Sequence, residues 1–239
     1  TPLRLVTIMS IVGRMRTRGW WLIAAAICLA SQAATAADAP ATITRVEQVK
    51  RLPARLSSQV PVRFEGVVTY VDLTYRSAFV QDTTGGLRLE VRMDHQLRPG
   101  ARAEFTALVT GGGPSPSATV EEVVRISDGA DQWPEPVRAA EQELATGALQ
   151  YRLVQVEGRV ESATVDHGGR LVLAVRVGGV LVKALVRSGF GGDYRKYVNA
   201  MARIAGVLAA GEDARGEIRS VRLYAASEGQ VQLVGPSPT

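Results

Sequence analysis

The residues best suited to contact a ligand lie close together, between positions 70 and 79. Tyr70, Tyr75 and Phe79 supply aromatic rings there, and Arg76 supplies one cation. Aromatic stacking combined with one positive charge suits a sugar, a nucleotide or an aromatic metabolite. The same residues also fit a structural role, with Phe79 in a core and the tyrosines in cross-strand surface pairs. We predict a ligand-binding face at these four residues, with the structural role as the alternative.

Residues for catalysis or metal binding are scarce. The chain holds two histidines, His95 and His167, and one cysteine, whereas a zinc site needs three or four ligands. Both histidines follow an aspartate, which is typical of polar turns. Glu121 and Glu122 are adjacent, so on a strand they point to opposite faces and cannot act together on one glycosidic bond. We therefore predict no metal, no cofactor and no catalytic activity in these residues.

Residues 1–36 have the pattern of a secretory signal peptide. Four arginines and no acidic residue occur in this segment, an apolar run of about 12 residues covers 19–30, and Ala34-Thr35-Ala36 forms a small-residue cleavage site. The apolar run is shorter than the roughly 20 residues that a membrane-spanning helix needs. We predict export to the periplasm with cleavage after Ala36, and a retained membrane anchor is the alternative.

The positive charge of the chain is concentrated in that segment. The whole sequence has 28 Lys+Arg against 23 Asp+Glu, a net charge of +5, but residues 37–239 hold 24 Lys+Arg against the same 23 acids. Bulk charge therefore does not predict a polyanionic partner for the processed chain. On this ground we expect no nucleic-acid partner, and contact with a membrane only through the signal segment or a continuation of the chain.

Apolar and polar residues alternate with a period of two over much of the chain. Residues 87–93 alternate apolar with charged at every step, and residues 101–109 follow a similar alternation. This period is typical of antiparallel strands with one buried face. Helical spacing is confined to short segments at about 43–52, 139–145 and 193–198. The fold class predicted is all-β with minor helix.

An internal repeat organises these strands. Residues 62–68 (VRFEGVV) match residues 154–160 (VQVEGRV), and further matches link 101–108 with 200–207 and 120–123 with 218–221. The offsets are 92, 99 and 98 residues, so the order is kept while one loop varies. Gly66 and Gly158 occupy the same place in the two copies. A glycine there lets a long first strand bend, and we predict that both are structural.

Each copy contains five predicted strands with a short connection after the third. The predicted ranges are 60–71, 76–82, 86–93, 101–110 and 118–127 in the first copy, and 151–165, 169–177, 179–187, 200–209 and 216–224 in the second. Five strands, a bending glycine and a helix between strands three and four are typical of an oligonucleotide/oligosaccharide-binding (OB) barrel. The sequence therefore predicts two tandem five-stranded OB-like β-barrels after a signal peptide.

The domain boundaries predicted from these patterns divide the chain into six parts. They are a signal peptide at 1–36, a lead segment with a short helix at 37–57, barrel 1 at 58–130, a linker at 131–149, barrel 2 at 150–227 and a linker-like tail at 228–239. The linker contains Trp133-Pro134-Glu135-Pro136, and the tail ends in Gly235-Pro-Ser-Pro-Thr239.

Several motifs in order resemble the extracytoplasmic input region of bacterial sensor histidine kinases. They are residues 61–69 (PVRFEGVVT), 79–87 (FVQDTTGGL), the Trp133-Pro-x-Pro linker and 154–158 (VQVEG). The resemblance covers about residues 41–227. It implies a periplasmic tandem barrel that senses a small ligand or an envelope protein and passes the signal to downstream domains of the same chain. The kinase motifs themselves are not among these residues, so kinase activity is not carried over.

Two functions remain open at this point. The first is a non-catalytic, ligand-binding input module of a two-component receptor. The second is a stand-alone secreted OB-fold binding protein for saccharide or nucleic acid. The two use the same barrel physics and differ only in context.

Overall fold

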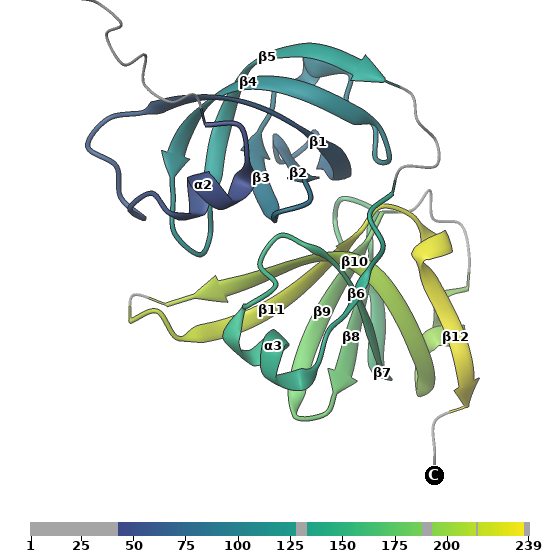
Figure 1. The fold of residues 1–239 in the computed structure, drawn as a ribbon. Helices are drawn as coiled ribbons and strands as arrows, with labels where there is room; N and C mark the ends of the chain where they lie inside the picture. Colours follow the sequence, from purple (N-terminus) through teal and green to yellow (C-terminus); the bar gives the residue numbers. More distant parts are fainter. Residues whose placement is uncertain (1–42, 128–132, 188–192, 214, 237–239) are drawn as a thin grey trace, which may run out of the picture. The chain divides into compact units, whose positions relative to one another are not determined.

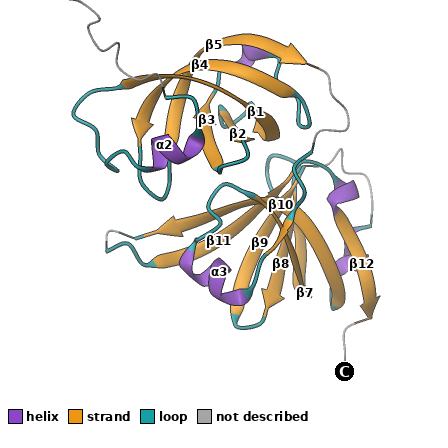
Figure 2. Ribbon diagram, viewed as in Figure 1, coloured by secondary structure: helices purple, strands orange, loops and turns teal. Residues whose placement is uncertain are grey.

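The structure is a computed structural model that describes residues 43–127, 133–187, 193–213 and 215–236. The predicted signal segment and its cleavage site at Ala34 and Ala36 lie outside the described residues. The described residues form a mostly β protein with two tandem OB-like barrels, as the sequence predicted (Figures 1 and 2). Residues from 43 onward belong to one compact unit.

Barrel 1 is a closed five-stranded ring. Its strands are β1 (Val60–Asp72), β2 (Ser77–Gln81), β3 (Gly86–Glu90), β4 (Arg102–Gly111) and β5 (Ser117–Ser127). They follow the order β1-β2-β3-β5-β4, and β4 pairs back with β1. A short 3₁₀ turn, η1 (Met93–His95), connects β3 to β4. The pairing of β3 with β5 is parallel, because the chain crosses the barrel end through η1 before returning along β4.

Barrel 2 repeats this ring and extends it at both edges. Its strands are β7 (Leu153–Val165), β8 (Leu171–Val177), β9 (Val180–Val186), β10 (Ala200–Glu212) and β11 (Ile218–Ala225). The order β7-β8-β9-β11-β10 closes through pairing of β10 with β7. β6 (Val137–Arg138) lies beside β7, and β12 (Val231–Pro236) lies beside β10. A 3₁₀ turn, η3 (Glu228–Gln230), precedes β12.

Short helices lie where the sequence showed helical spacing. α2 (Val46–Lys50) precedes barrel 1, α3 (Glu141–Thr146) precedes barrel 2, and the 3₁₀ helix η2 (Tyr194–Tyr197) fills the connection after β9. The carboxylate of Asp193 accepts a hydrogen bond from the Arg195 amide and so caps η2. Among the described residues, no helix has the length and apolar character needed to span a membrane.

The prediction of a linker-like tail over 228–239 was wrong for residues 231–236. This segment is β12, and its register pairs Val231 with Ile204 and Gln232 with Arg203 of β10. Val231 packs against the core of barrel 2, whereas Leu233 and Val234 are exposed. A short edge strand with one inward-pointing residue shows little alternation of apolar and polar residues, so its sequence does not predict a strand. It forms a strand because it pairs with β10, which is distant in sequence. The 131–149 segment likewise contributes the fully buried Leu144 to the core of barrel 2.

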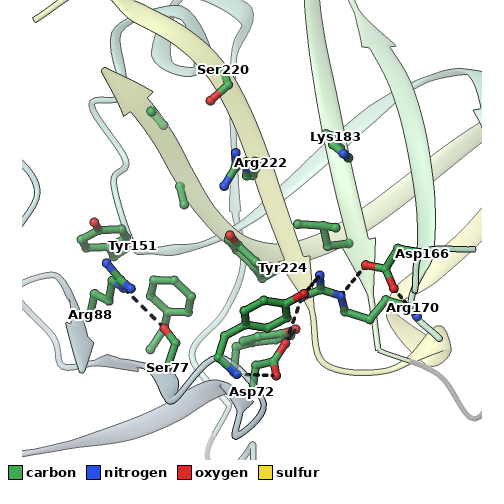
Figure 3. A pocket seen from close by; sticks show the side chains of 17 residues that line it. Asp72, Ser77, Arg88, Tyr151, Asp166, Arg170, Lys183, Ser220, Arg222 and Tyr224 are labelled. Atoms are coloured by element: carbon green, nitrogen blue, oxygen red, sulfur yellow. Dashed lines mark hydrogen bonds and ion pairs between the residues drawn. The ribbon is translucent and has the colours of Figure 1, made fainter. Parts of the chain in front are cut away.

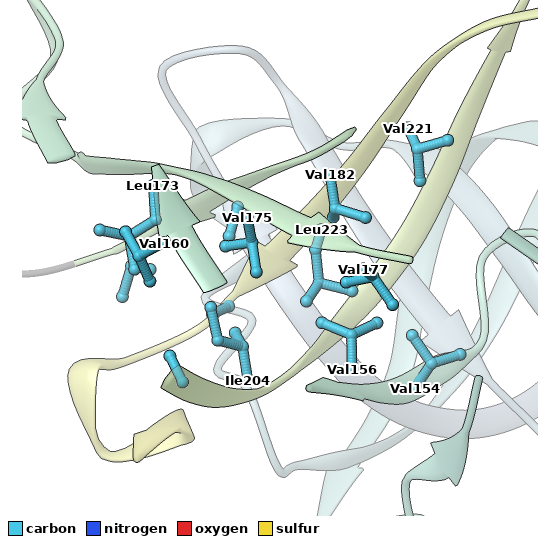
Figure 4. Packing of buried hydrophobic residues seen from close by; sticks show 14 of the residues in the cluster. Val154, Val156, Val160, Leu173, Val175, Val177, Val182, Ile204, Val221 and Leu223 are labelled. Carbon is cyan, nitrogen blue, oxygen red and sulfur yellow. The ribbon is translucent and has the colours of Figure 1, made fainter. Parts of the chain in front are cut away.

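Each barrel has its own apolar core, built from the inward side of the alternating strands. The core of barrel 1 contains Phe64, Leu87 and Phe105 among its buried residues. The rings of Phe64 and Phe105 stack, with their centroids 5.4 Å apart. The core of barrel 2 is made mainly of valine and leucine from all five strands (Figure 4). A third, smaller cluster joins residues of both barrels and is described with the candidate site.

Gly66 and Gly158 lie where neighbouring strands approach closely. A Cβ at Gly66 would lie 2.5 Å from Val80 Cγ1 and 3.0 Å from the Gln81 carbonyl oxygen. A Cβ at Gly158 would overlap the Arg176 carbonyl oxygen. The obstacle at Gly158 is backbone, which cannot move aside as a flexible side chain can. This geometry supports the predicted structural role of both glycines.

Candidate functional site

The two barrels meet through an aromatic cluster. Tyr70 and Phe79 come from β1 and β2 of barrel 1, and Tyr151 and Tyr224 come from barrel 2. Ring centroids lie 5.2 Å apart for Tyr70 and Tyr224, 5.2 Å for Phe79 and Tyr151, and 5.3 Å for Phe79 and Tyr224. Such tilted arrangements suit the quadrupoles of aromatic rings. The cluster therefore holds the face of barrel 1 formed by β1 and β2 against barrel 2.

This packing corrects the prediction of an open aromatic platform. Tyr70 is 1% exposed and Phe79 is 3% exposed, so neither presents a free ring face for stacking. Burial, followed by the neighbouring Asp72, raises the pKa of Tyr70 to about 12. Tyr75 is 59% exposed and remains accessible. The sequence pattern placed the rings on one hairpin correctly, but it carried no information about which outer face a second barrel covers.

Hydrogen bonds between the barrels fix the same junction. The Gln81 side-chain oxygen accepts a buried hydrogen bond from the Leu153 amide at 2.7 Å, and Arg187 Nη1 donates to the Val71 carbonyl at 2.8 Å. A Cβ at Gly86 would overlap the Tyr151 carbonyl, so glycine allows the two backbones to touch. Because a buried polar group without a partner is costly, these bonds specify one arrangement of the barrels.

Arg170 joins the first hairpin of barrel 2 to the first hairpin of barrel 1. Its Nε donates to Asp166 Oδ2 at 2.8 Å, its Nη1 to Asp72 Oδ2 at 3.0 Å and its Nη2 to the Tyr75 hydroxyl at 3.3 Å. The guanidinium also lies 4.6 Å from the centre of the Tyr75 ring. We call these four residues, Arg170, Asp166, Asp72 and Tyr75, the Arg170 clamp.

Within the clamp, Asp166 and Arg170 stay charged because each stabilises the charge of the other. The Arg170 side chain is only 16% exposed, and the side chains of Asp72 and Asp166 are 13% and 24% exposed. Burial opposes the charged form of Asp166, but hydrogen bonds from the Arg170 backbone and side chain lower the pKa of this carboxyl overall. Burial likewise works against the Arg170 charge, and Asp166 outweighs it, so the pKa of Arg170 is raised.

A cleft of about 540 Å³ lies beside the cluster and the clamp (Figure 3). Barrel 1 contributes β1, β2 and β3 to its walls, and barrel 2 contributes β9, β10 and β11. Four cations line it, Arg88, Arg170, Lys183 and Arg222, against two carboxylates, Asp72 and Asp166. Both carboxylates are bound by Arg170, so the remaining three cations dominate the charge of the cleft.

Lys183 and Arg222 are the most informative of these cations. They are register partners on the adjacent parallel strands β9 and β11, and both project from the exposed face of barrel 2. Among the residues that the structure describes, neither forms an ion pair, and the β10 neighbour of Arg222 is the small Ala209. Two like charges side by side repel each other, so this pair favours an anion between or above them.

Polar and aromatic groups accompany the cations. Ser77 and Ser220 supply hydroxyls, and Arg88 Nε donates a 3.4 Å hydrogen bond to Ser77 Oγ (Figure 3). Tyr224 is half-buried and lines the cleft between the two barrels. Burial raises the pKa of Tyr151 despite the nearby Arg88, so its phenol is a neutral group at physiological pH. The arrangement can bind an anion and contact a flat ring.

The four residues predicted to bind ligand thus have different fates. Tyr70, Tyr75 and Phe79 all line the cleft, although two of them are buried in the cluster. Arg76 does not line it: this residue lies in a turn with φ +49° and pairs with Glu90 at 3.4 Å. Sequence reasoning missed the cations of barrel 2. Their outward positions in the period-two alternation of β9 and β11 were the available signal.

Metal binding finds no support in the described part of the chain. No group of three or more His, Cys, Asp or Glu side chains there is arranged to hold a metal ion. His95 lies in η1, and His167 lies in the turn between β7 and β8.

Comparisons with known proteins add only a likeness of fold. No family model and no curated protein matches the sequence. Among solved structures, the chain is similar to fission yeast Pot1 with ssDNA, at 10% identity over 80% of this chain and 88% of that one, with a TM-score of 0.34. It is similar to the Ifi202 HINa domain in complex with dsDNA, at 11% identity over 76% and 100%, with a TM-score of 0.33.

A third similar structure is the aspartyl tRNA synthetase from Entamoeba histolytica. The identity is 17% over 46% of this chain, and the TM-score is 0.31. The match spans 24% of the synthetase chain. At these identities and TM-scores, what the three proteins bind or do is not transferred to this chain.

Proposed function

We propose that this chain is a non-catalytic binding module whose inter-barrel cleft takes an anionic ligand carrying a planar ring, the chemistry shared by a nucleotide and a short single strand of nucleic acid. The observation that carries the proposal is the register pair Lys183 and Arg222, with Arg88 across the cleft. Cations of this kind bind phosphate oxygens. The charge of the cleft, rather than any likeness to solved structures, supports it.

The net charge of the chain and the local charge of the cleft predict different partners. Residues 37–239 are almost neutral, a composition that predicts no nucleic-acid partner, but three cations that form no ion pair within the described residues, Arg88, Lys183 and Arg222, gather at one surface. Binding depends on the local potential that a ligand meets, and low-dielectric walls concentrate that potential. The half-buried Tyr224 supplies a ring beside the cations, and base stacking on such a ring tolerates different sequences.

Binding without catalysis is supported by the state of the carboxylates. Asp72 and Asp166 are the acids that line the cleft, and Arg170 holds both of them as ion pairs. A general base needs a free lone pair within reach of a substrate proton. The Oδ1 atoms of both carboxylates are also occupied, because each accepts two backbone amide hydrogen bonds from its own turn, so both side chains act as structural anions.

A charge-removal experiment tests the proposal. Fluorescence anisotropy with a fluorescein-labelled oligothymidylate of about twelve nucleotides, and calorimetry with ATP, would be run on the unmodified chain and on Lys183→Gln/Arg222→Gln. We expect a Kd on the order of 1 to 100 μM for the oligonucleotide at low salt. Loss of two phosphate contacts should weaken binding about tenfold or more and lower the slope of log K against log salt by about 1.4.

The matched control is Arg125→Gln/Arg138→Gln. Both arginines are exposed on strands, neither lines the cleft, and the net charge of this variant equals that of the test variant. Equal weakening by the two double variants, or no binding of either probe by the unmodified chain, would reject the proposal. Binding of ATP as tightly as of the oligonucleotide identifies a nucleotide site. Much tighter binding of the oligonucleotide identifies a single-strand site.

Export and a receptor context form the second candidate, and their support is the sequence alone. The signal-peptide pattern over residues 1–36 and the ordered motifs at 61–69, 79–87, 133–136 and 154–158 favour a periplasmic input module of a histidine kinase receptor. In that context the cleft would be the sensory site. Amino-terminal sequencing of periplasmic material should give a chain beginning at Ala37. A chain that keeps Arg18 would contradict export with cleavage.

A further inference from the structure

A second groove lies on the outer face of barrel 2 and shares no residue with the inter-barrel cleft. Its volume is about 480 Å³. The floor is formed by β7 and β10, β12 with its preceding turn η3 forms one side, and the segment Trp133–Pro136 forms another. A concavity of this size is in the range of small-molecule sites.

The strand register brings uncharged amides onto this face. Gln155 of β7 pairs with Ala205 of β10, and Arg203 of β10 pairs with Gln232 of β12. These residues therefore project to the same side of three neighbouring strands. Within the described part of the chain, the side chains of Gln155 and Gln232 have no hydrogen-bond partner. Each amide offers both donors and an acceptor to a ligand.

The positive charge of Arg203, which lines the groove, is neutralised by an ion pair. Arg203 donates from Nη2 to Glu157 Oε2 at 2.9 Å and from Nε to the same oxygen at 3.1 Å. Gln230 uses its side-chain oxygen to accept from the Ala226 amide at 2.6 Å, which leaves its NH₂ group as a donor. The groove thus presents hydrogen-bonding groups with a balanced charge, in contrast to the cationic inter-barrel cleft.

Trp133 supplies a flat apolar wall in a fixed position. The indole packs against Gly100 of barrel 1, where a Cβ would lie 2.8 Å from Trp133 Nε1, and it is still 36% exposed. Gly100 also has φ +89°, a conformation that side chains other than glycine rarely adopt. An aromatic plane bordered by amides and a serine hydroxyl, Ser227, matches a ring with one apolar face and several hydroxyl groups.

We propose that this groove binds a neutral oligosaccharide, with a pyranose ring stacked on Trp133 and its hydroxyls bonded to Gln155 and Gln232. The apolar CH face of a pyranose meets the indole, and the hydroxyls replace water on the two amides. Neutralisation of Arg203 by Glu157 disfavours charged sugars. The groove shares no residue with the anion-binding cleft, so rejection of either proposal leaves the other unaffected.

Intrinsic fluorescence reports directly on this site. The sequence contains three tryptophans, and Trp20 and Trp21 lie in the predicted signal segment. In a chain that begins at Ala37, Trp133 is therefore the single tryptophan. Titration of that chain with maltotriose, cellotriose and tri-N-acetylchitotriose should give a saturable change in emission for at least one probe, with a Kd on the order of 0.1 to 1 mM.

Three variants separate a binding role from a structural one. Gln155→Ala and Gln232→Ala should each weaken binding about threefold or more, because a lost hydrogen bond to a hydroxyl contributes about that factor. Trp133→Ala should weaken it about tenfold or more, measured by calorimetry because the fluorophore is gone. Gln142→Ala, an exposed amide on α3 outside the groove, is the matched control and should bind as the unmodified chain does.

Circular dichroism and thermal midpoints would be recorded for every variant. The two glutamine variants keep the test valid even if Trp133→Ala destabilises the fold through loss of the packing against Gly100. No saturable signal with any of the three probes overturns the proposal. Binding that survives both glutamine substitutions unchanged, or binding weakened equally by Gln142→Ala, also overturns it.

Discussion

Replacing Arg170 by glutamine removes the group that joins the two first hairpins. The variant loses the ion pairs to Asp166 at 2.8 Å and Asp72 at 3.0 Å, together with the contact to Tyr75. It leaves two carboxylates in surroundings where their side chains are only 24% and 13% exposed. Breaking a fully buried pair costs about 3 to 5 kcal/mol, whereas an exposed pair contributes about 0 to 1 kcal/mol. We expect an intermediate loss of about 2 kcal/mol in the free energy of unfolding.

The loss should depend on pH in a defined direction. In the folded chain the pKa of Asp166 lies below its ordinary value of 3.8, because the Arg170 hydrogen bonds and charge outweigh burial. A carboxyl with a depressed folded pKa stabilises the fold fully above its unfolded pKa, and this contribution disappears as the pH falls through the folded value. The difference between the unmodified chain and Arg170→Gln should be complete at pH 7 and shrink below about pH 4.

Urea unfolding at pH 7, 5 and 3, followed by circular dichroism, measures both effects. Arg176→Gln is the control, because Arg176 forms an equally short ion pair with Glu161 at 2.9 Å on an exposed surface, and little change is expected there. If Arg170→Gln unfolds within about 0.5 kcal/mol of the unmodified chain at pH 7, the clamp contributes no more than a surface pair. A difference that stays constant down to pH 3 would refute the electrostatic origin.

The remaining predictions concern packing. Gly66→Val and Gly158→Val should each cost about 1 to 3 kcal/mol, with the larger loss at Gly158 where backbone blocks the side chain, and unchanged urea midpoints would show that these glycines are incidental. Tyr70→Ala should destabilise by about 2 to 4 kcal/mol because the ring is 1% exposed, whereas Tyr75→Ala, which removes an exposed ring and its contact with Arg170, should cost about 1 kcal/mol or less, and thermal midpoints compare them. Gly86→Ala places a Cβ on the Tyr151 carbonyl, so calorimetry should show the two barrels unfolding in separate steps; a single unshifted transition would contradict this.

Much of the fold could be predicted from the local alternation of apolar and polar residues. The period-two alternation at residues 87–93 and 101–109 determined which side chains enter a core, because a strand places successive residues on opposite faces whatever it packs against. The internal repeat determined that there are two barrels of one topology. The exceptions were β6 and β12, which become strands only because β7 and β10 offer them an edge to pair with.

The candidate sites, by contrast, depend on which outer faces come together. Sequence reasoning predicted that Tyr70, Tyr75 and Phe79 share one hairpin, and all three do line the cleft. It had no means to predict that Tyr151 and Tyr224, far along the chain, would cover two of those rings.

The sequence by itself determined the ten ring strands, their inward faces and the tandem barrels, because alternation and repetition are properties of neighbouring residues. Only the tertiary structure decided that Lys183 and Arg222 stand side by side in one cleft with Arg88, and that Gln155, Gln232 and Trp133 border one groove. The physical reason is that strand register and barrel docking are set by long-range contacts. No local period records these contacts, so the sites that they create cannot be read from the order of residues alone.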